Sequence, residues 1–107
     1  MKTVFRPQFW VDLADGVAYL AENASPEIAR RWHAEVMATI SGLEHWPSLG
    51  RLRRDLTPSD IRSLVLPRYP RYLLFYRCDA DTIEVLRIKH GMMDFPRLFG
   101  EGKAPPP

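Results

Sequence analysis

Two segments in the N-terminal half repeat apolar residues at the spacing of an α-helix. The first segment runs from Pro7 to about Glu22, and the second runs from Pro26 to about Glu44. The apolar positions are Phe9, Leu13, Val17 and Leu20 in the first and Ile28, Trp32, Val36, Ile40 and Leu43 in the second. Side chains three or four residues apart form one stripe of an amphipathic helix. Ser25 and Pro26 suit the cap and first position of the second helix, so the pattern predicts an antiparallel helical hairpin.

The C-terminal half carries the shorter apolar runs that are typical of strands. Three such runs span Ile61–Leu66, Arg71–Arg77 and Ile83–Lys89, and their connectors are only four or five residues long. Successive strands with short connectors form an antiparallel meander. In the last run, strict alternation would place Ile83, Val85, Arg87 and Lys89 on one face and Glu84, Leu86, Ile88 and His90 on the other. Thr3–Arg6 is a further, brief strand before Pro7.

These elements predict an α+β fold. A hairpin of two amphipathic helices cannot bury both stripes by itself, so it must pack on a flat surface, which the strands supply. We therefore expect a short N-terminal strand, an antiparallel helical hairpin and a three-stranded antiparallel meander, with the hairpin on one face of the sheet. The length of 107 residues suits one domain, predicted over residues 1–99. Gly100–Pro107 ends in three prolines and is predicted to be a flexible tail.

Positive charge is concentrated between Gly50 and Arg77. This segment holds seven arginines and two aspartates, a local charge of +5, whereas the whole chain has a net charge of +2. One interpretation is a folded basic surface that binds an anionic partner. The other is a set of charged strand edges that prevent aggregation. The residues of this segment do not distinguish the two interpretations.

The sequence offers little material for a metal or cofactor site. Cys78 is the only cysteine, which excludes an intramolecular disulfide and a multi-cysteine zinc site. His33, His45 and His90 lack the spacing of zinc ligands. No metal and no cofactor is therefore predicted. The N-terminus lacks a signal-peptide core and no apolar run is long enough for a membrane span, so we expect a cytoplasmic protein without a membrane partner.

Two kinds of side chain leave alternatives open. His90 follows a strand beside Lys89 and is either a proton acceptor at a functional site or a structural histidine at a strand end. Trp10, Trp32 and Trp46 lie on or next to the helices. For these tryptophans we expect packing in the core or the hairpin rather than stacking on bases.

Five motifs in order resemble one known superfamily. They are N-x-S-P-E-x-A-x-R at Asn23–Arg31, L-x-x-x-P-x-x-G-R-x-x-R-D-L at Leu43–Leu56, I-R-S-L at Ile61–Leu64, Y-x-x-Y-L-L-F-Y-R at Tyr69–Arg77 and I-x-V-L-R-I-x-H-G at Ile83–Gly91. Over roughly residues 3–99 the chain resembles the RelE/ParE superfamily of bacterial toxins from type II toxin–antitoxin operons. The resemblance is closer to the ParE branch.

The resemblance implies three possible functions. The first is a ParE-like toxin that a cognate antitoxin neutralises and that acts by binding and inhibiting DNA gyrase. The second is a RelE-like, ribosome-dependent mRNA endoribonuclease, in which Arg62, Arg87 and His90 would be the catalytic residues. The third is a non-toxic, degenerate family member that serves as a partner or regulator in its operon.

The resemblance also implies an interface with the antitoxin or target. The residues predicted to form it are Arg51, Arg53, Arg54, Arg62, Arg71, Met92, Phe95 and Phe99. Ribonuclease members of the superfamily often carry a tyrosine near the end of the last strand, but here His90 is followed by Gly91, Met92, Met93 and Asp94. The usual lysines before the second strand are arginines in this chain. Arginine binds phosphate well but is a poor proton donor, so these departures favour a binding surface over a catalytic one.

Overall fold

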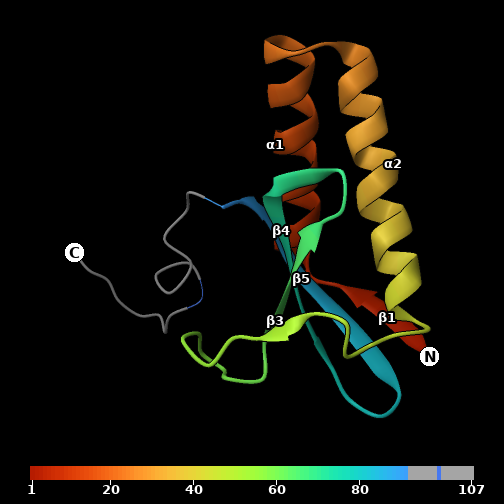
Figure 1. The fold of residues 1–107 in the computed structure, drawn as a ribbon, viewed down its shortest axis with the longest axis vertical. Helices are drawn as coiled ribbons and strands as arrows, with labels where there is room; N and C mark the ends of the chain where they lie inside the picture. Colours follow the sequence, from red (N-terminus) through yellow and green to blue (C-terminus); the bar gives the residue numbers. More distant parts are fainter. Residues whose placement is uncertain (92–98, 100–107) are drawn as a thin grey trace.

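Two long helices stand side by side and pack against a five-stranded sheet (Figure 1). A computed structural model describes residues 1–91 and Phe99 of the chain. The elements are β1 (Lys2–Phe5), α1 (Pro7–Asn23), α2 (Pro26–Leu43), β2 (Arg51–Leu52), β3 (Arg62–Leu66), β4 (Tyr69–Cys78) and β5 (Thr82–His90). The predicted α+β fold is confirmed. The prediction of a flexible tail at 100–107 lies outside the described residues.

The sheet contains the predicted meander and two further strands. The strand order is β1-β5-β4-β3-β2, and β3, β4 and β5 are antiparallel neighbours as expected. β1 joins the sheet parallel to β5. Arg51–Leu52, which lies outside every predicted strand, pairs with β3 as the edge strand β2. A strand of two residues has no detectable alternation, so pairing with a neighbour defines it rather than its own pattern.

The helical hairpin forms where the sequence places it. The Ser25 Oγ accepts a hydrogen bond from the Ile28 backbone N–H at 3.0 Å, and Pro26 occupies the first position of α2. This cap satisfies one of the donors that the first turn of a helix leaves without a partner. The apolar stripes of both helices then enter the main core with residues of β3, β4 and β5.

The two faces of the sheet are covered by different parts of the chain. The helix face carries Leu74 and Tyr76, which are buried against α1 and α2 in the main core. The opposite face, here called the outer face, carries Phe75, which packs with Leu56 and Ile61 in a second and smaller cluster. Leu56 and Ile61 belong to the segment between β2 and β3. That segment therefore covers part of the outer face.

An irregularity in β5 overturns the predicted alternation of that strand. Phe75 pairs with Arg87 but the next residue, Tyr76, pairs with Val85, so Leu86 is an extra residue between them. Such a bulge shifts the side chains that follow it to the other face. Ile88 consequently shares the buried main core with Val85 rather than facing away from it. The buried apolar positions change accordingly from Ile83 and Val85 to Ile88, so the assumption of strict alternation along the whole strand was wrong.

The three tryptophans do not share one environment. Trp32 is completely buried and its ring lies 5.1 Å from that of Tyr72, as predicted for a core residue. Trp10 is 46% exposed and lies at the edge of the core, where its ring contacts those of Phe5 and Phe9. Trp46 is 70% exposed, so the expectation that it packs in the core or hairpin is wrong. It lies in the turn after α2, beyond the helical stripe.

Candidate interaction surface

The arginines between Gly50 and Arg77 divide into two groups. Arg53, Arg62 and Arg77 make hydrogen bonds within the fold. Arg51, Arg54, Arg68 and Arg71 are exposed. Some of these positive charges thus stabilise the fold, and only the exposed arginines are accessible to a partner.

Arg53 fixes the segment that covers the outer face. Its Nε and Nη2 donate to both carboxylate oxygens of Asp55, at 2.9 and 2.7 Å, and its Nη1 donates to the Ser63 Oγ at 3.2 Å. The guanidinium also lies 5.9 Å from the centre of the Phe75 ring. The hydrogen bonds from Arg53 lower the pKa of Asp55. Although predicted as an interface residue, Arg53 is buried and its charge is paired with Asp55.

Arg62 and Tyr76 together hold the loop between α2 and β2. The Arg62 Nη1 donates to the carbonyl oxygens of Gly50 and Ser48, at 2.7 and 3.3 Å. The Tyr76 hydroxyl accepts from the Gly50 N–H at 2.8 Å and donates to the Pro47 carbonyl at 2.6 Å. Burial raises the pKa of Tyr76, so it keeps its proton and remains a donor. Arg62 is therefore a support for this loop.

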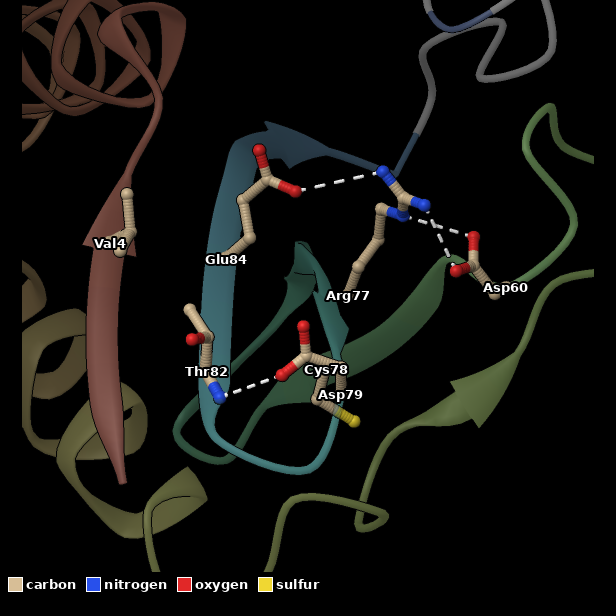
Figure 2. Close-up of a pocket in the computed structure, with 7 residues that line it drawn as sticks. All are labelled: Val4, Asp60, Arg77, Cys78, Asp79, Thr82 and Glu84. Atoms are coloured by element: carbon tan, nitrogen blue, oxygen red, sulfur yellow. Dashed lines mark hydrogen bonds and ion pairs between the residues drawn. The ribbon is translucent and has the colours of Figure 1, made fainter.

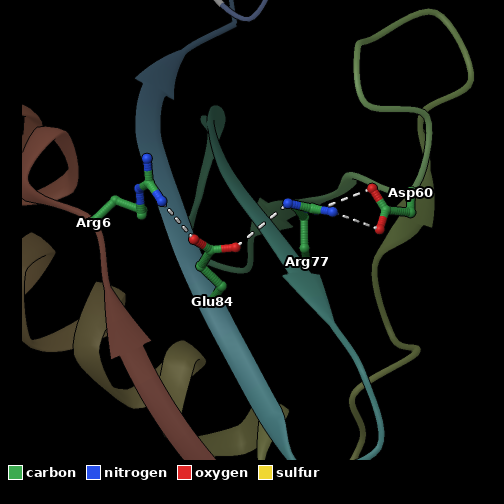
Figure 3. A network of polar contacts seen from close by, with 4 residues as sticks. All are labelled: Arg6, Asp60, Arg77 and Glu84. Carbon is green, nitrogen blue, oxygen red and sulfur yellow. Dashed lines mark hydrogen bonds and ion pairs between the residues drawn. The ribbon is translucent and has the colours of Figure 1, made fainter.

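Arg77 lies at the centre of a chain of charges on the outer face (Figure 3). Its Nε and Nη2 donate to the two carboxylate oxygens of Asp60 at 3.0 Å, and its Nη1 lies 3.6 Å from Glu84. Glu84 also accepts from Arg6 at 3.0 Å. These contacts lower the pKa of Asp60 and raise the pKa of Arg77. The network links β4, β5, the start of α1 and the covering segment, but its exposure to water keeps its contribution to stability small.

A hollow of about 320 Å³ lies beside this network (Figure 2). Its lining includes Asp60, Arg77, Asp79 and Glu84 together with Cys78. Asp79 is engaged locally, because its Oδ1 accepts from the backbone N–H groups of residues 81 and 82 in the β4–β5 turn. Within residues 1–91 and 99, no group of three histidine, cysteine or acidic side chains is arranged to hold a metal ion. The hollow lacks the donor set of a metal centre.

Three of the four exposed arginines, Arg51, Arg54 and Arg71, lie on or beside the outer face, whereas Arg68 lies 3.9 Å from Glu35 of α2. Arg51 pairs with Ser63 across β2 and β3, and Ser63 pairs with Phe75, so both lie on the outer face. Leu73 and Arg71 precede Phe75 by two and four residues on β4, which places them on the same face. Val65, opposite Leu73, is 48% exposed between Arg51 and Arg71. We call Arg51, Arg54, Val65 and Arg71 the basic outer surface, since Arg54 belongs to the covering segment. It combines free positive charge with an apolar patch.

Asp12 is the most deeply buried charged group in the described part of the chain. Its side chain is 2% exposed and accepts from Arg87 at 2.7 and 3.0 Å and from the Ile88 backbone N–H at 3.2 Å. The Lys89 Nζ lies 3.3 Å from the same carboxylate. β1 stops at Phe5, opposite Val85, so the carboxylate takes the place of a strand at the open edge of β5. We call this arrangement the Asp12 clasp; it attaches α1 to β5.

The three candidate catalytic residues are not brought together. Arg62 is directed towards the loop before β2, at one side of the sheet. Arg87 belongs to the Asp12 clasp, which lies at the other side beneath α1. His90 faces the helices, where its ring meets that of Tyr72 edge-on at 5.4 Å. A general base and its phosphate-binding partners must lie within reach of one reacting group, and these three diverge.

The remaining interface residues are near the C-terminus. The Phe99 ring lies 5.0 Å from that of Phe75 and adds to the small outer-face cluster. The predictions for Met92 and Phe95 lie outside the described residues. Sequence reasoning missed Asp12 and Tyr76. For Asp12 a signal existed, because this acidic residue directly precedes Leu13 at the border of the apolar stripe of α1.

Comparison with solved structures identifies the class of fold. One solved structure, described as "Chromosomal ParDE TA system from P. aeruginosa", superposes with a TM-score of 0.71. The match covers 84% of this chain and 95% of the other, at 21% sequence identity. At this identity the likeness establishes the fold: a helical hairpin on a sheet, as found in a protein of a toxin–antitoxin system.

The family follows from the sequence itself. A model of the family described as "ParE toxin of type II toxin-antitoxin system, parDE" matches residues 3–95. The chain therefore belongs to the ParE toxin family. No curated protein sequence gives a significant match.

In the part of the chain that the structure describes, no helix has the length and apolar character needed to cross a membrane.

Proposed function

We propose that this protein is a cytoplasmic toxin that its cognate antitoxin holds inactive and that, once released, binds and inhibits DNA gyrase. Membership of the ParE family over residues 3–95 carries the proposal. The basic outer surface supplies a place where an acidic partner can bind, with Arg51 and Arg71 exposed on neighbouring parts of one face. Positive charge of this kind speeds association with acidic surfaces and favours correct partners over wrong ones.

The geometry favours binding over RNA cleavage. Arg87 is occupied by Asp12, and Arg62 is occupied by two backbone carbonyls. A ribonuclease would have to break both sets of contacts in order to place these side chains on one phosphate. Binding through exposed arginines requires no such rearrangement.

The target is tested by adding the purified protein to a gyrase supercoiling assay. We expect supercoiling to be inhibited in proportion to the toxin, and expression without the antitoxin to stop growth. Primer extension on translated messages should show no new ends. Normal supercoiling at large toxin excess would contradict the gyrase assignment, and new message ends would support the ribonuclease. Unchanged growth would support a non-toxic family member.

The interface with the antitoxin is tested by charge reversal on the basic outer surface. Arg51→Glu and Arg71→Glu should each weaken the complex about tenfold, because each replaces an attraction with a repulsion worth more than about 1.4 kcal/mol. Binding can be measured by calorimetry at two salt concentrations, and the loss should shrink at high salt. Arg53 and Arg62 are unsuitable for this test because their replacement would disturb the fold.

Arg30→Glu is the matched control. Arg30 is exposed on α2, away from the outer face, and carries the same charge. Its reversal should leave the affinity within about twofold. If Arg30→Glu weakens the complex as much as Arg51→Glu, only the overall charge matters and the basic outer surface is not the interface.

A further inference from the structure

The loop that runs from the end of α2 to β2 (Figure 1) displays two large apolar side chains to solvent. Trp46 is 70% exposed and Leu49 is 60% exposed, the two largest fractions among the exposed large apolar side chains of residues 1–91 and 99. The Leu49 N–H donates to the Trp46 carbonyl at 3.0 Å, so a single turn carries both side chains. We call residues 44–50 the Trp46 loop. Apolar side chains gathered at a surface mark a site where another molecule binds.

Side chains of the sheet hold the backbone of the Trp46 loop in one conformation. The Tyr76 hydroxyl donates to the Pro47 carbonyl and accepts from the Gly50 N–H. Arg62 donates to the carbonyls of Ser48 and Gly50. A Cβ at Gly50 would lie 2.8 Å from the Tyr76 ring, so the loop packs directly on the sheet. A loop that is already fixed loses little conformational entropy when a partner binds, which favours tight association.

The exposed charge that follows the two apolar side chains is positive. Arg51 and Arg54 come directly after the loop and are exposed. Asp55 is paired with Arg53, and Glu44 at the start of the loop accepts a hydrogen bond from β1 at 2.8 Å. The side of the loop that leads into β2 therefore suits a partner with carboxylates beside its apolar contact.

We propose that the Trp46 loop docks this toxin on its target, by inserting Trp46 and Leu49 into an apolar pocket that carboxylates border. This inference rests on the proposed function, which names DNA gyrase as the target. Projecting side chains fit a preformed pocket of a folded protein, whereas a flexible antitoxin segment binds in a groove. A second copy of this chain is a poorer occupant, since it would bring its own Arg51 towards the first.

The position of the loop gives the antitoxin a way to block the target. Leu49 lies two residues before Arg51, which begins β2 and belongs to the basic outer surface. Two residues of chain span at most about 7 Å. An antitoxin segment bound on the basic outer surface therefore reaches the edge of the Trp46 loop, so that antitoxin and target exclude each other.

The test compares gyrase inhibition with antitoxin binding for the same full-length variants. Trp46→Ala should raise the toxin concentration that half-inhibits supercoiling by about tenfold or more, because a buried tryptophan anchor carries much of the binding energy of an interface. Leu49→Ala should raise it by a smaller factor. Trp46→Ala should keep the wild-type affinity for the cognate antitoxin and the wild-type melting temperature, since its side chain is exposed.

Tyr19→Ala is the matched control. Tyr19 is an aromatic residue of α1 with a similar exposure of 59%, but it lies outside the Trp46 loop. Its replacement should leave the inhibition of supercoiling unchanged. If Tyr19→Ala weakens inhibition as much as Trp46→Ala, exposed aromatic side chains act without regard to place and the inference is overturned.

The other outcomes separate the two proposals. If the wild-type toxin leaves supercoiling unchanged, the proposed function fails together with this inference. If the wild type inhibits and Trp46→Ala inhibits equally well, only the inference fails. If Trp46→Ala instead weakens the antitoxin complex, the loop is an antitoxin anchor and the inference is overturned. A wild-type dimer that Trp46→Ala converts to a monomer would also overturn it, because the occupant is then a second copy.

Discussion

Replacing Asp12 with alanine is expected to destabilise the protein by about 3 kcal/mol. The change leaves the partly buried cations of Arg87 and Lys89 without their counter-charge and removes the acceptor of the Ile88 N–H. Removing one member of a buried ion pair costs about 3–5 kcal/mol, and some exposure of the two cations places this case at the lower end. The free energy of unfolding, measured in urea, reports the loss directly.

Asp15→Ala is the control for this experiment. Asp15 lies on the same helix and carries the same charge, but it is exposed. Its replacement should change the free energy of unfolding by no more than about 0.5 kcal/mol. Equal losses in the two variants would show that the negative charge of α1, rather than the Asp12 clasp, stabilises the fold.

Gly16→Ala is the second substitution with a large expected effect. A Cβ at this position would lie 2.3 Å from the Cη2 atom of Trp32, whose ring is completely buried between the helices and the sheet. Alanine favours a helix over glycine by up to about 1 kcal/mol, but forcing an extra methyl group into a packed core costs about 1–3 kcal/mol. The clash should win, because the Cβ would meet three atoms of a rigid ring that is completely buried. We expect a net loss of about 1–2 kcal/mol and a lower melting temperature.

Gly42→Ala isolates the contribution of helix propensity. A Cβ at Gly42, near the end of α2, has nothing within 4 Å. This variant should be unchanged or stabilised by up to about 1 kcal/mol. Stabilisation of similar size in both variants would mean that α1 and α2 do not approach each other closely at Gly16.

The local elements of this protein are predictable because each follows from neighbouring residues. The apolar repeat from Phe9 to Leu20 defines α1, and Ser25 with Pro26 defines the start of α2. The strand β4 was expected over Arg71–Arg77 from its apolar run. It begins earlier, at Tyr69, because Tyr69 already pairs with Leu66 of β3. The edge strand Arg51–Leu52 was missed, since a strand so short exists only through its pairing with β3.

The sequence by itself determined the helical hairpin, the meander, the family and the excess of arginine between Gly50 and Arg77. Only the tertiary structure decided which charges are available to a partner. Arg51, Arg53, Arg62 and Arg71 all belong to the same arginine-rich segment. Arg53 and Arg62 nevertheless donate to groups within the fold, whereas Arg51 and Arg71 are exposed. Asp12 meets Arg87 across 75 residues of chain, a contact that no local pattern encodes. The use of a charge depends on which groups the fold brings within a few ångströms of it, because hydrogen bonds and ion pairs act over that range.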